Sequence, residues 1–327
     1  MKKQIFAIMA AGLLLSSCGA RTEAAQATDA ADVDTAAVST VYYIKDITPE
    51  NLVKIYNALG RKAEGKVAVK ISTGESKKSH QLEPALIKPL IDEVGGTLVE
   101  CNTAYAGNRN TTEAHRKTAE EHGYTAIAEV DIMDAEGDTI LPLEGGRHLK
   151  YDIVGKSYPG YDFTVVLSHF KGHAMGGFGG ALKNVAIGIA SSAGKSYIHS
   201  AGKTSDVDSI WSNIAAQDDF LESMGEACKA VFDHAGENIL FINVANNISV
   251  DCDCDGNAAP PSMGDLGILA SLDPVALDRA CVDMVANSDD PGKDAVMERI
   301  NSRHGTHILD YSEQLGLGSQ KYRIVEL

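Results

Sequence analysis

The sequence predicts an α/β protein with a mostly parallel sheet flanked by helices and one β-rich insert. Short apolar runs alternate with helix-length amphipathic segments along most of the chain, which is the pattern of right-handed β-α-β units. The alternation stops over residues 127–151, where acidic and glycine turns separate short apolar pieces. Because such turns commonly connect short strands, this segment is predicted to be the β-rich insert.

The first half of the chain is predicted to hold three strands and three helices in alternation. Thr48 is suited to an N-cap and Pro49 to the first helical position, so the first helix begins there. Gly95 and Gly96 end the second helix. The strands are expected at residues 41–45, 66–71 and 97–101, and the helices at about 48–59, 84–94 and 111–122.

The second half is predicted to continue the same alternation. Its strands are expected at residues 161–167, 238–244, 267–270 and 322–325, and its helices at about 218–234, at 274–287 and, as two short ones, after residue 295. Asp273 and Pro274 supply the N-cap and first position of the helix at 274–287. Trp211 is the only tryptophan, and it is predicted to lie in the core.

The N-terminus resembles that of an exported bacterial lipoprotein. Two lysines precede a short apolar run, which is typical of a signal peptide at residues 1–17. The sequence Leu15-Ser16-Ser17-Cys18-Gly19 resembles a lipobox, in which Cys18 is lipidated. Residues 18–39 are then a flexible tether, and 40–327 the α/β domain, with two lobes at 40–160 and 161–327 as an alternative. The expected location is the cell envelope, with membrane contact through the lipid alone.

Composition excludes several classes of function. The net charge of −16 over 327 residues argues against nucleic acid as a partner, because no basic surface is available to neutralise phosphates. Beyond Cys18, the five remaining cysteines are sparse and show no C-x2-C-x2-C run, so a ferredoxin-type iron–sulfur site is not expected. A small-molecule ligand is the expected partner.

The glycine-rich stretch at residues 168–200 is the first candidate for a functional site, because it follows a predicted buried strand. His169 and His173 have the spacing of two metal ligands on a helix, although the glycines around them disfavour a helix. Lys183 could receive an anionic group or form a covalent link to a carbonyl. The alternative interpretation is that Lys183 is a surface lysine at a turn.

The second candidate is the acidic, cysteine-containing segment at residues 251–256, directly after another buried strand. Its potential ligands are Asp251, Cys252, Asp253, Cys254 and Asp255. A continued strand would place the two thiols on one face and the three carboxylates on the other. Three interpretations remain open: a metal-binding or redox turn, a Cys252–Cys254 disulfide, and a solvated acidic turn.

Several motifs together resemble the bacterial domain-of-unknown-function family 362 (DUF 362). They are Gly65-Lys-Val-Ala-Val-Lys-Ile-Ser72, His169-Phe-Lys-Gly-His173 with Gly179-Gly-Ala-Leu-Lys-Asn184, Asn246-Asn-Ile-Ser-Val-Asp-Cys-Asp-Cys-Asp255, and Ile268-Leu-Ala-Ser-Leu-Asp-Pro-Val-Ala-Leu-Asp278. The resemblance covers nearly everything after the tether. It implies a fold and a site region, but it names no reaction.

A more distant similarity concerns the nickel-pincer lactate racemase family. His173, Lys183 and His199 have the spacing H-x9-K-x15-H that is similar to the core of that family. The resemblance implies that Lys183 anchors a pyridinium-derived cofactor, that His199 ligates nickel and that His173 moves a proton. Gly179, Gly180 and Asn184 would then contribute to cofactor binding.

One departure from the racemase pattern affects the predicted chemistry. Those racemases use a second acid/base histidine, and the matching loop here, residues 107–111, carries Asn108 instead. The prediction is therefore metal- or cofactor-dependent chemistry on a small anionic molecule, centred on His169, His173, Lys183 and His199. The metal could be nickel, zinc or iron. The alternative is a noncatalytic lipoprotein that binds a metal or a small ligand.

Overall fold

An eight-stranded sheet forms the centre of the computed structural model, which describes residues 38–327. Across the sheet the strands follow the order β12 (Tyr322–Glu326), β1 (Ser39–Ile44), β11 (Gly267–Ser271), β10 (Ile239–Ala245), β7 (Phe163–His169), β2 (Val67–Lys70), β3 (Thr97–Glu100) and β4 (Val130–Ile132). Within this sheet only β11 runs against its neighbours. The predicted mostly parallel α/β architecture is confirmed.

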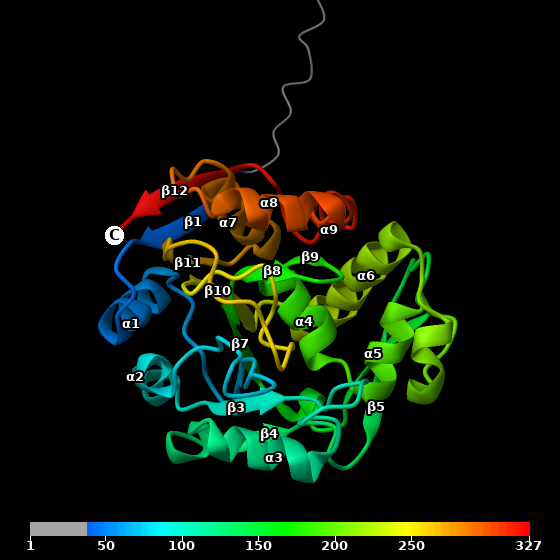
Figure 1. Ribbon diagram of the computed structural model, residues 1–327. Coiled ribbons are helices and arrows are strands. Elements are labelled where there is room, and N and C mark those ends of the chain that lie inside the picture. The colour runs from blue at the N-terminus through cyan, green and yellow to red at the C-terminus, as the bar shows by residue number, and fades with distance from the viewer. Residues whose placement is uncertain (1–37) are drawn as a thin grey trace, which may run out of the picture. The chain divides into compact units, whose positions relative to one another are not determined.

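Helices cover both faces of the sheet (Figure 1). One apolar cluster unites the sheet with α1 (Pro49–Ala58), α2 (Pro84–Val94) and α3 (Thr112–Glu121). The other cluster includes α4 (Ala181–Ile189), α5 (Ser192–His199), α6 (Gln217–Ala235), α7 (Pro274–Ala286), α8 (Lys293–Ser302) and α9 (His307–Gln314). Alternate residues of a strand point to opposite faces, so the central strands are buried on both sides and read as continuous apolar runs.

The β-rich insert is present, but its strands belong to two different sheets. β4 joins the edge of the main sheet in parallel with β3. β5 (Asp138–Pro142) and β6 (Tyr151–Gly155) instead form a separate antiparallel hairpin. A second small hairpin, β8 (Lys171–His173) with β9 (Gly177–Gly179), lies inside the glycine-rich stretch. Short 3₁₀ segments occur at Tyr124–Ala126 (η1), Tyr158–Gly160 (η2) and Val207–Ser212 (η3).

The two halves of the sequence build one sheet, since β2 pairs with β7 and β1 pairs with β11. Residues 40–160 and 161–327 are therefore not separated by a structural boundary. The proposed signal peptide, Cys18 and nearly all of the tether lie outside the described residues. Within residues 38–327, no helix is both long enough and apolar enough to cross a membrane.

The parallel strands determine where a ligand site can form. β2, β3, β7 and β10 run in the same direction, so their carboxyl ends lie at one edge of the sheet. In open α/β sheets, this edge is where ligands bind. The loops that follow these four strands contain both candidate segments and the Asn108 loop.

Candidate functional site

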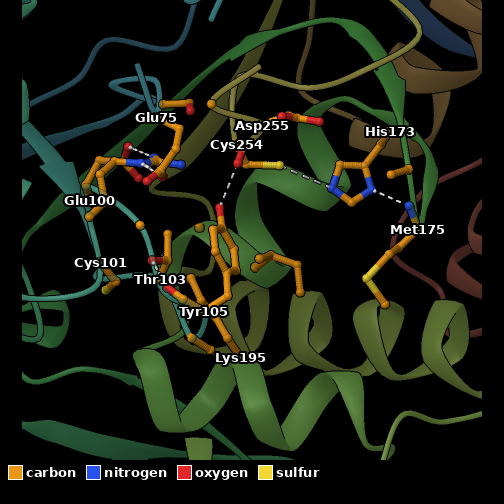
Figure 2. Close-up of a pocket in the computed structure, with 18 of the residues that line it drawn as sticks. Glu75, Glu100, Cys101, Thr103, Tyr105, His173, Met175, Lys195, Cys254 and Asp255 are labelled. Atoms are coloured by element: carbon orange, nitrogen blue, oxygen red, sulfur yellow. Dashed lines mark hydrogen bonds and ion pairs between the residues drawn. The ribbon is translucent and has the colours of Figure 1, made fainter. Parts of the chain in front are cut away.

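A cavity of about 590 Å³ lies among the loops that follow β2, β3, β7 and β10 (Figure 2). Its size is within the usual range of small-molecule sites. The polar part of its lining includes Lys70, Glu75, Glu100, Arg109, His173, Lys183, Lys195, His199, Cys254 and Asp255. Tyr105, Met175, Ile187, Ile210 and Trp211 supply most of the larger apolar surfaces. We refer to it as the main cavity.

The main cavity brings together the three residues with the H-x9-K-x15-H spacing. His173 lies at the end of β8, Lys183 in the first turn of α4 and His199 in the last turn of α5. All three side chains contribute to the same lining. The electrostatic influence of Lys183 and His199 on His173 agrees with this proximity.

Lys183 faces the main cavity without a hydrogen bond or an ion pair to any residue from 38 to 327. Burial lowers the pKa of its amine to about 7, and the neighbouring cations Lys171, Lys70 and Arg109 add to that effect. An amine with this pKa is about half neutral at pH 7. A neutral amine is a nucleophile, so Lys183 can attack a carbonyl carbon.

His199 presents an open nitrogen to the main cavity. Its Nδ1 donates to the carbonyl of Lys195 at 2.7 Å, and its ring stacks on Phe220 with 4.7 Å between centroids. Burial is the largest cause that lowers the pKa of His199, to about 4, so the ring is neutral at pH 7. Since Nδ1 carries the proton, the lone pair is at Nε2, which is the arrangement that a metal ligand or a base requires.

His173 has the opposite tautomer. Its Nδ1 accepts the backbone N–H groups of Gly176 at 2.8 Å and Met175 at 3.2 Å. The proton of the neutral ring is therefore on Nε2, which lies 3.7 Å from the Sγ of Cys254 (Figure 2). Burial and the nearby cation Lys183 hold the pKa of His173 well below its ordinary value. In this state His173 is a hydrogen-bond donor at Nε2, with no lone pair there to accept a proton or a metal.

The segment at 251–256 is a turn, so the prediction that a continued strand would sort thiols from carboxylates is wrong. Cys252 and Cys254 form a disulfide, one of the three interpretations that the sequence left open. The turn replaces a strand because Asp253 is held in the interior by ion pairs. Its carboxylate lies 2.8 Å from Nδ1 of His169 and 2.7 Å from Nζ of Lys171.

The other two carboxylates of this segment, Asp251 and Asp255, have surroundings different from those of Asp253. Asp251 pairs with Arg299 at 3.0 Å, and Asp255 is exposed at the main cavity. His169 uses its second ring nitrogen to contact the carbonyl of Asn246 at 2.5 Å. Both nitrogens of His169 thus face oxygen acceptors, and neither lone pair is open to a metal or a substrate.

Gly180 and Asn184 hold the scaffold of the site together. A side chain at Gly180 would collide with the carboxylate of Asp278, which caps α4 by accepting from Ala181 N–H at 2.7 Å and Leu182 N–H at 3.0 Å. The Asn184 amide donates to Lys70 O at 3.2 Å and Leu167 O at 3.3 Å, so it joins the ends of β2 and β7. Gly179 is part of β9 and lies over Lys171.

Sequence reasoning missed a buried ionic cluster in the floor of the main cavity. Glu100 pairs with Lys70 at 3.1 Å and with Arg109 at 3.2 Å, and Arg109 also pairs with Glu75 at 2.9 Å. The pKa of Glu100 lies well below its ordinary value, because Lys70 and the hydrogen-bonded His115 outweigh the effect of burial. Each of these residues follows or ends a strand, and that position was the one available signal.

Lys195 and Trp211 were also missed. Lys195 is buried, and its Nζ donates to the carbonyl of Ala190 at 2.6 Å. Burial lowers its pKa, and no carboxylate from residues 38 to 327 lies within ion-pair distance of it. The prediction that Trp211 lies in the core is wrong: it is 62% exposed, because the 3₁₀ segment η3 carries it to the mouth of the main cavity.

Comparison with known families identifies the chain. The profile of the family described as "Domain of unknown function (DUF362)" matches residues 67–283. The chain belongs to the DUF362 family. The matched segment contains every residue placed above in the main cavity and in the disulfide turn. No curated protein matches the chain.

Two solved structures are similar to this DUF362 chain. One is a protein from Thermotoga maritima, with a TM-score of 0.42 and 14% identity over 83% of this chain and 61% of the other. The chain therefore spans about 61% of the length of that protein. The second is the lactate racemase apoprotein from Thermoanaerobacterium thermosaccharolyticum, with a TM-score of 0.40 and 12% identity over 88% of this chain and 82% of the other.

Two groups in the described part of the DUF362 chain have the composition of metal sites. His173, Cys252 and Cys254 form one group, with ligand atoms within 4.8 Å of one another. Asp218, His304 and His307 form the other; none of them lines the main cavity, and Asp218 and His304 are exposed. In the first group, the disulfide leaves no thiolate to bind a metal, and the proton on Nε2 of His173 occupies the lone pair of that nitrogen.

Proposed function

We propose that this protein is a lipoprotein of the cell envelope that binds a small anionic molecule in the main cavity, with Lys183 as the group that bonds to it. The observation that carries the proposal is Lys183 itself. It is an unpaired amine with a pKa of about 7 that faces a ligand-sized cavity. The preference for an anion follows from charge. Lys70 and Arg109 have carboxylate partners, whereas Lys183 and Lys195 have none among residues 38–327.

The neutral form of Lys183 provides the first chemical step. Its nitrogen adds to a carbonyl carbon of the ligand, and loss of water then gives an imine. Lys195 would pair with a carboxylate on the same ligand; that both lysines line one cavity supports this. A small 2-oxo acid has both groups, and it is the simplest ligand that satisfies this arrangement.

A metal-containing cofactor of the kind that the racemase resemblance implies is compatible with these residues. Lys183 would anchor it, and the open Nε2 of His199 would ligate the metal, with Nδ1 held by Lys195 as in many metal-binding histidines. When bound, a metal supplies a Lewis acid beside the substrate. Nickel, zinc and iron all accept imidazole nitrogen.

The same residues do not support racemisation. A racemase needs a base on each side of the substrate carbon, and His173 offers a proton at Nε2 rather than a lone pair. Asn108, in the loop where the second histidine would be, donates its side-chain amide to the carbonyl of Glu75 at 2.9 Å. We therefore assign His173 the role of a hydrogen-bond donor to the bound ligand.

The test is trapping of the imine. The purified protein is incubated at pH 7 with glyoxylate or pyruvate and borohydride, and the modified peptide is identified by mass spectrometry. A half-neutral Lys183 should react on the order of a thousand times faster than a lysine with an ordinary pKa. Lys183→Met should abolish the adduct, whereas Lys229→Met, at an exposed i,i+4 pair, should not. Equal labelling of Lys183 and Lys229 would refute the proposal. Metal analysis of wild type and of His199→Ala tests whether His199 binds a metal.

The anchoring part of the proposal rests on Cys18, which lies outside the described residues. Partition of the full-length protein into detergent, lost in Cys18→Ala, would support lipidation. Recovery of wild type in the aqueous phase would refute it.

Noncatalytic capture of the ligand is the second candidate, and the lack of a second base at Asn108 favours it. Trp211 provides the assay, because the only tryptophan lies at the mouth of the main cavity. A fluorescence change on adding pyruvate, with no chemical change in the recovered pyruvate, supports capture. Conversion of the pyruvate supports catalysis.

A further inference from the structure

The Cys252–Cys254 disulfide forms part of the wall between two pockets. Cys254 contributes to the lining of the main cavity, and both cysteines line a small adjoining pocket. Cys252 is 5% exposed, whereas Cys254 is partly open. The two sulfurs of this disulfide therefore differ in their access to a molecule that enters the main cavity.

This disulfide contributes little to holding the fold together. It joins residues that are two positions apart, so it closes a loop too short to restrict the unfolded chain appreciably. The turn is fixed by other bonds. Asp253 is held by His169 and Lys171, its carbonyl accepts from Glu75 N–H at 2.8 Å, and the carbonyl of Cys254 accepts from the Tyr105 hydroxyl at 3.0 Å. The two sulfurs would thus stay close after reduction.

We propose that the Cys252–Cys254 disulfide is redox-active and exchanges with small anionic thiols that enter through the main cavity, with Cys254 as the sulfur attacked. The geometry of the main cavity supports the choice of substrate. A volume of about 590 Å³ admits a small molecule but no folded protein. Lys183 and Lys195 favour an anionic thiol over a cationic one.

The surroundings of the two sulfurs match the two steps of exchange. In the first step, an incoming thiolate bonds to Sγ of Cys254, the disulfide breaks, and the electron pair leaves with Cys252. The backbone N–H of Cys254 lies 3.2 Å from Sγ of Cys252 and stabilises that leaving thiolate. This thiolate then takes up the proton released by the incoming thiol.

In the second step, another thiolate attacks the sulfur of the incoming molecule, and Cys254 leaves as a thiolate. His173 Nε2–H, 3.7 Å away, is placed to stabilise it (Figure 2). Overall, two thiols are oxidised to one disulfide, and the protein disulfide is reduced to two thiols. The reverse reaction with an oxidised small disulfide restores the starting state. Cys101, Cys228 and Cys281 are buried thiols whose pKa values are raised by burial, so they do not compete.

The experiment compares single-cysteine variants of the folded protein. Cys252→Ser leaves Cys254 free at the cavity, and Cys254→Ser leaves Cys252 free but buried. Each variant is mixed with the disulfide of 2-mercaptoethanesulfonate, and the mixed disulfide is followed by mass spectrometry. We expect Cys252→Ser to react at least ten times faster than Cys254→Ser. Equal rates, or faster reaction of Cys254→Ser, would overturn the proposal.

Two further measurements address the wild-type protein and the choice of thiol. Reduced 2-mercaptoethanesulfonate should open the disulfide while circular dichroism stays native, and cysteamine at equal thiolate concentration should be several-fold slower. A disulfide that opens only when the protein unfolds would show a structural bond and refute redox activity. Faster reaction with cysteamine would refute the anionic preference.

Discussion

The ion pairs of Asp253 should make a large and measurable contribution to stability. Asp253 is 2% exposed and lies between His169 and Lys171. Replacement of Asp253 by Asn leaves the Lys171 ammonium in the interior without its counter-charge. Removal of one partner from a buried ion pair typically costs about 3–5 kcal/mol. We therefore expect Asp253→Asn to lower the free energy of unfolding by about this amount.

The proton equilibrium of Lys171 gives an independent upper limit on the loss of stability in Asp253→Asn. At pH 7 the unpaired ammonium can release its proton, and this costs about 1.4 kcal/mol for each unit between the ordinary lysine pKa of about 10.4 and pH 7. The total of about 4–5 kcal/mol is the most that the lysine can contribute to the loss. Burial already lowers the pKa of Lys171 when Asp253 is present, so release of the proton is the expected response.

The stability difference between wild type and Asp253→Asn should decrease as the pH rises. In Asp253→Asn, the folded-state pKa of Lys171 lies below its unfolded value, so the unfolded chain binds more protons and the stability of the variant rises with pH. The gap between wild type and variant should therefore shrink from pH 7 to pH 9, by up to about 1.4 kcal/mol per unit. Urea denaturation followed by circular dichroism measures both free energies.

Two variants complete this test. Asp251→Asn removes the carboxylate that pairs with Arg299, which is more exposed than Asp253. This variant should lower the free energy of unfolding by no more than about 1 kcal/mol. The double variant Asp253→Asn/Lys171→Met removes both charges and should be more stable than Asp253→Asn alone. The reasoning is refuted if Asp253→Asn unfolds within about 1 kcal/mol of wild type, or if the double variant is the less stable of the two.

Three other changes have defined outcomes. Trp211→Ala should change the free energy of unfolding by no more than about 0.5 kcal/mol, because Trp211 is exposed, while weakening binding of pyruvate measured by calorimetry. Burial raises the pKa of Asp278 to about 6, so its folded form retains a proton that the unfolded chain loses. Between pH 4 and pH 7, denaturation should therefore show wild type losing about 2 kcal/mol of stability relative to Asp278→Asn. Gly188→Ala places a methyl group against the side chain of Lys70, so it should destabilise the protein by about 1–3 kcal/mol and weaken pyruvate binding. A large loss of stability in Trp211→Ala would refute the first prediction. A stability difference between wild type and Asp278→Asn that does not change with pH would refute the second, and unchanged stability of Gly188→Ala would refute the third.

The positions of most strands and helices could be predicted because they depend on local sequence, but α4, α5 and the β8–β9 hairpin were not predicted. Thr48 and Asp273 do cap the predicted helices, with side chains that accept backbone N–H groups. The grouping of His173, Lys183 and His199 was an expectation from the resemblance of their spacing to the core of the nickel-pincer racemase family, and all three line the main cavity. The loops after parallel strands meet at one sheet edge, which explains why Cys254 of the disulfide turn lines the same cavity.

The protonation states of the site could not be predicted, because they depend on burial in the folded chain and on which backbone groups the turn or helix brings to each ring nitrogen. His173 and His199 look alike in sequence, yet backbone groups fix the proton at Nε2 in one and at Nδ1 in the other. Glu100 and Arg109 pair through the fold, 9 residues apart. Trp211 was assigned to the core on hydrophobicity alone, which cannot distinguish a core residue from one at a cavity mouth.

The pKa of Lys183 distinguishes the two ways in which this amine could hold an anion. With a pKa of about 7, the amine is about 90% protonated at pH 6 and about 10% protonated at pH 8. A ligand that only pairs with the ammonium should therefore bind about ten times more weakly at pH 8 than at pH 6, with uptake of nearly one proton at pH 8. A ligand that forms a neutral imine consumes the neutral amine and releases only water, so its binding should strengthen over the same range. Calorimetry with acetate and with pyruvate in two buffers of different ionisation enthalpy measures both trends, and Lys183→Met should remove them. The same trend for both ligands would show that Lys183 does not form a neutral imine with pyruvate.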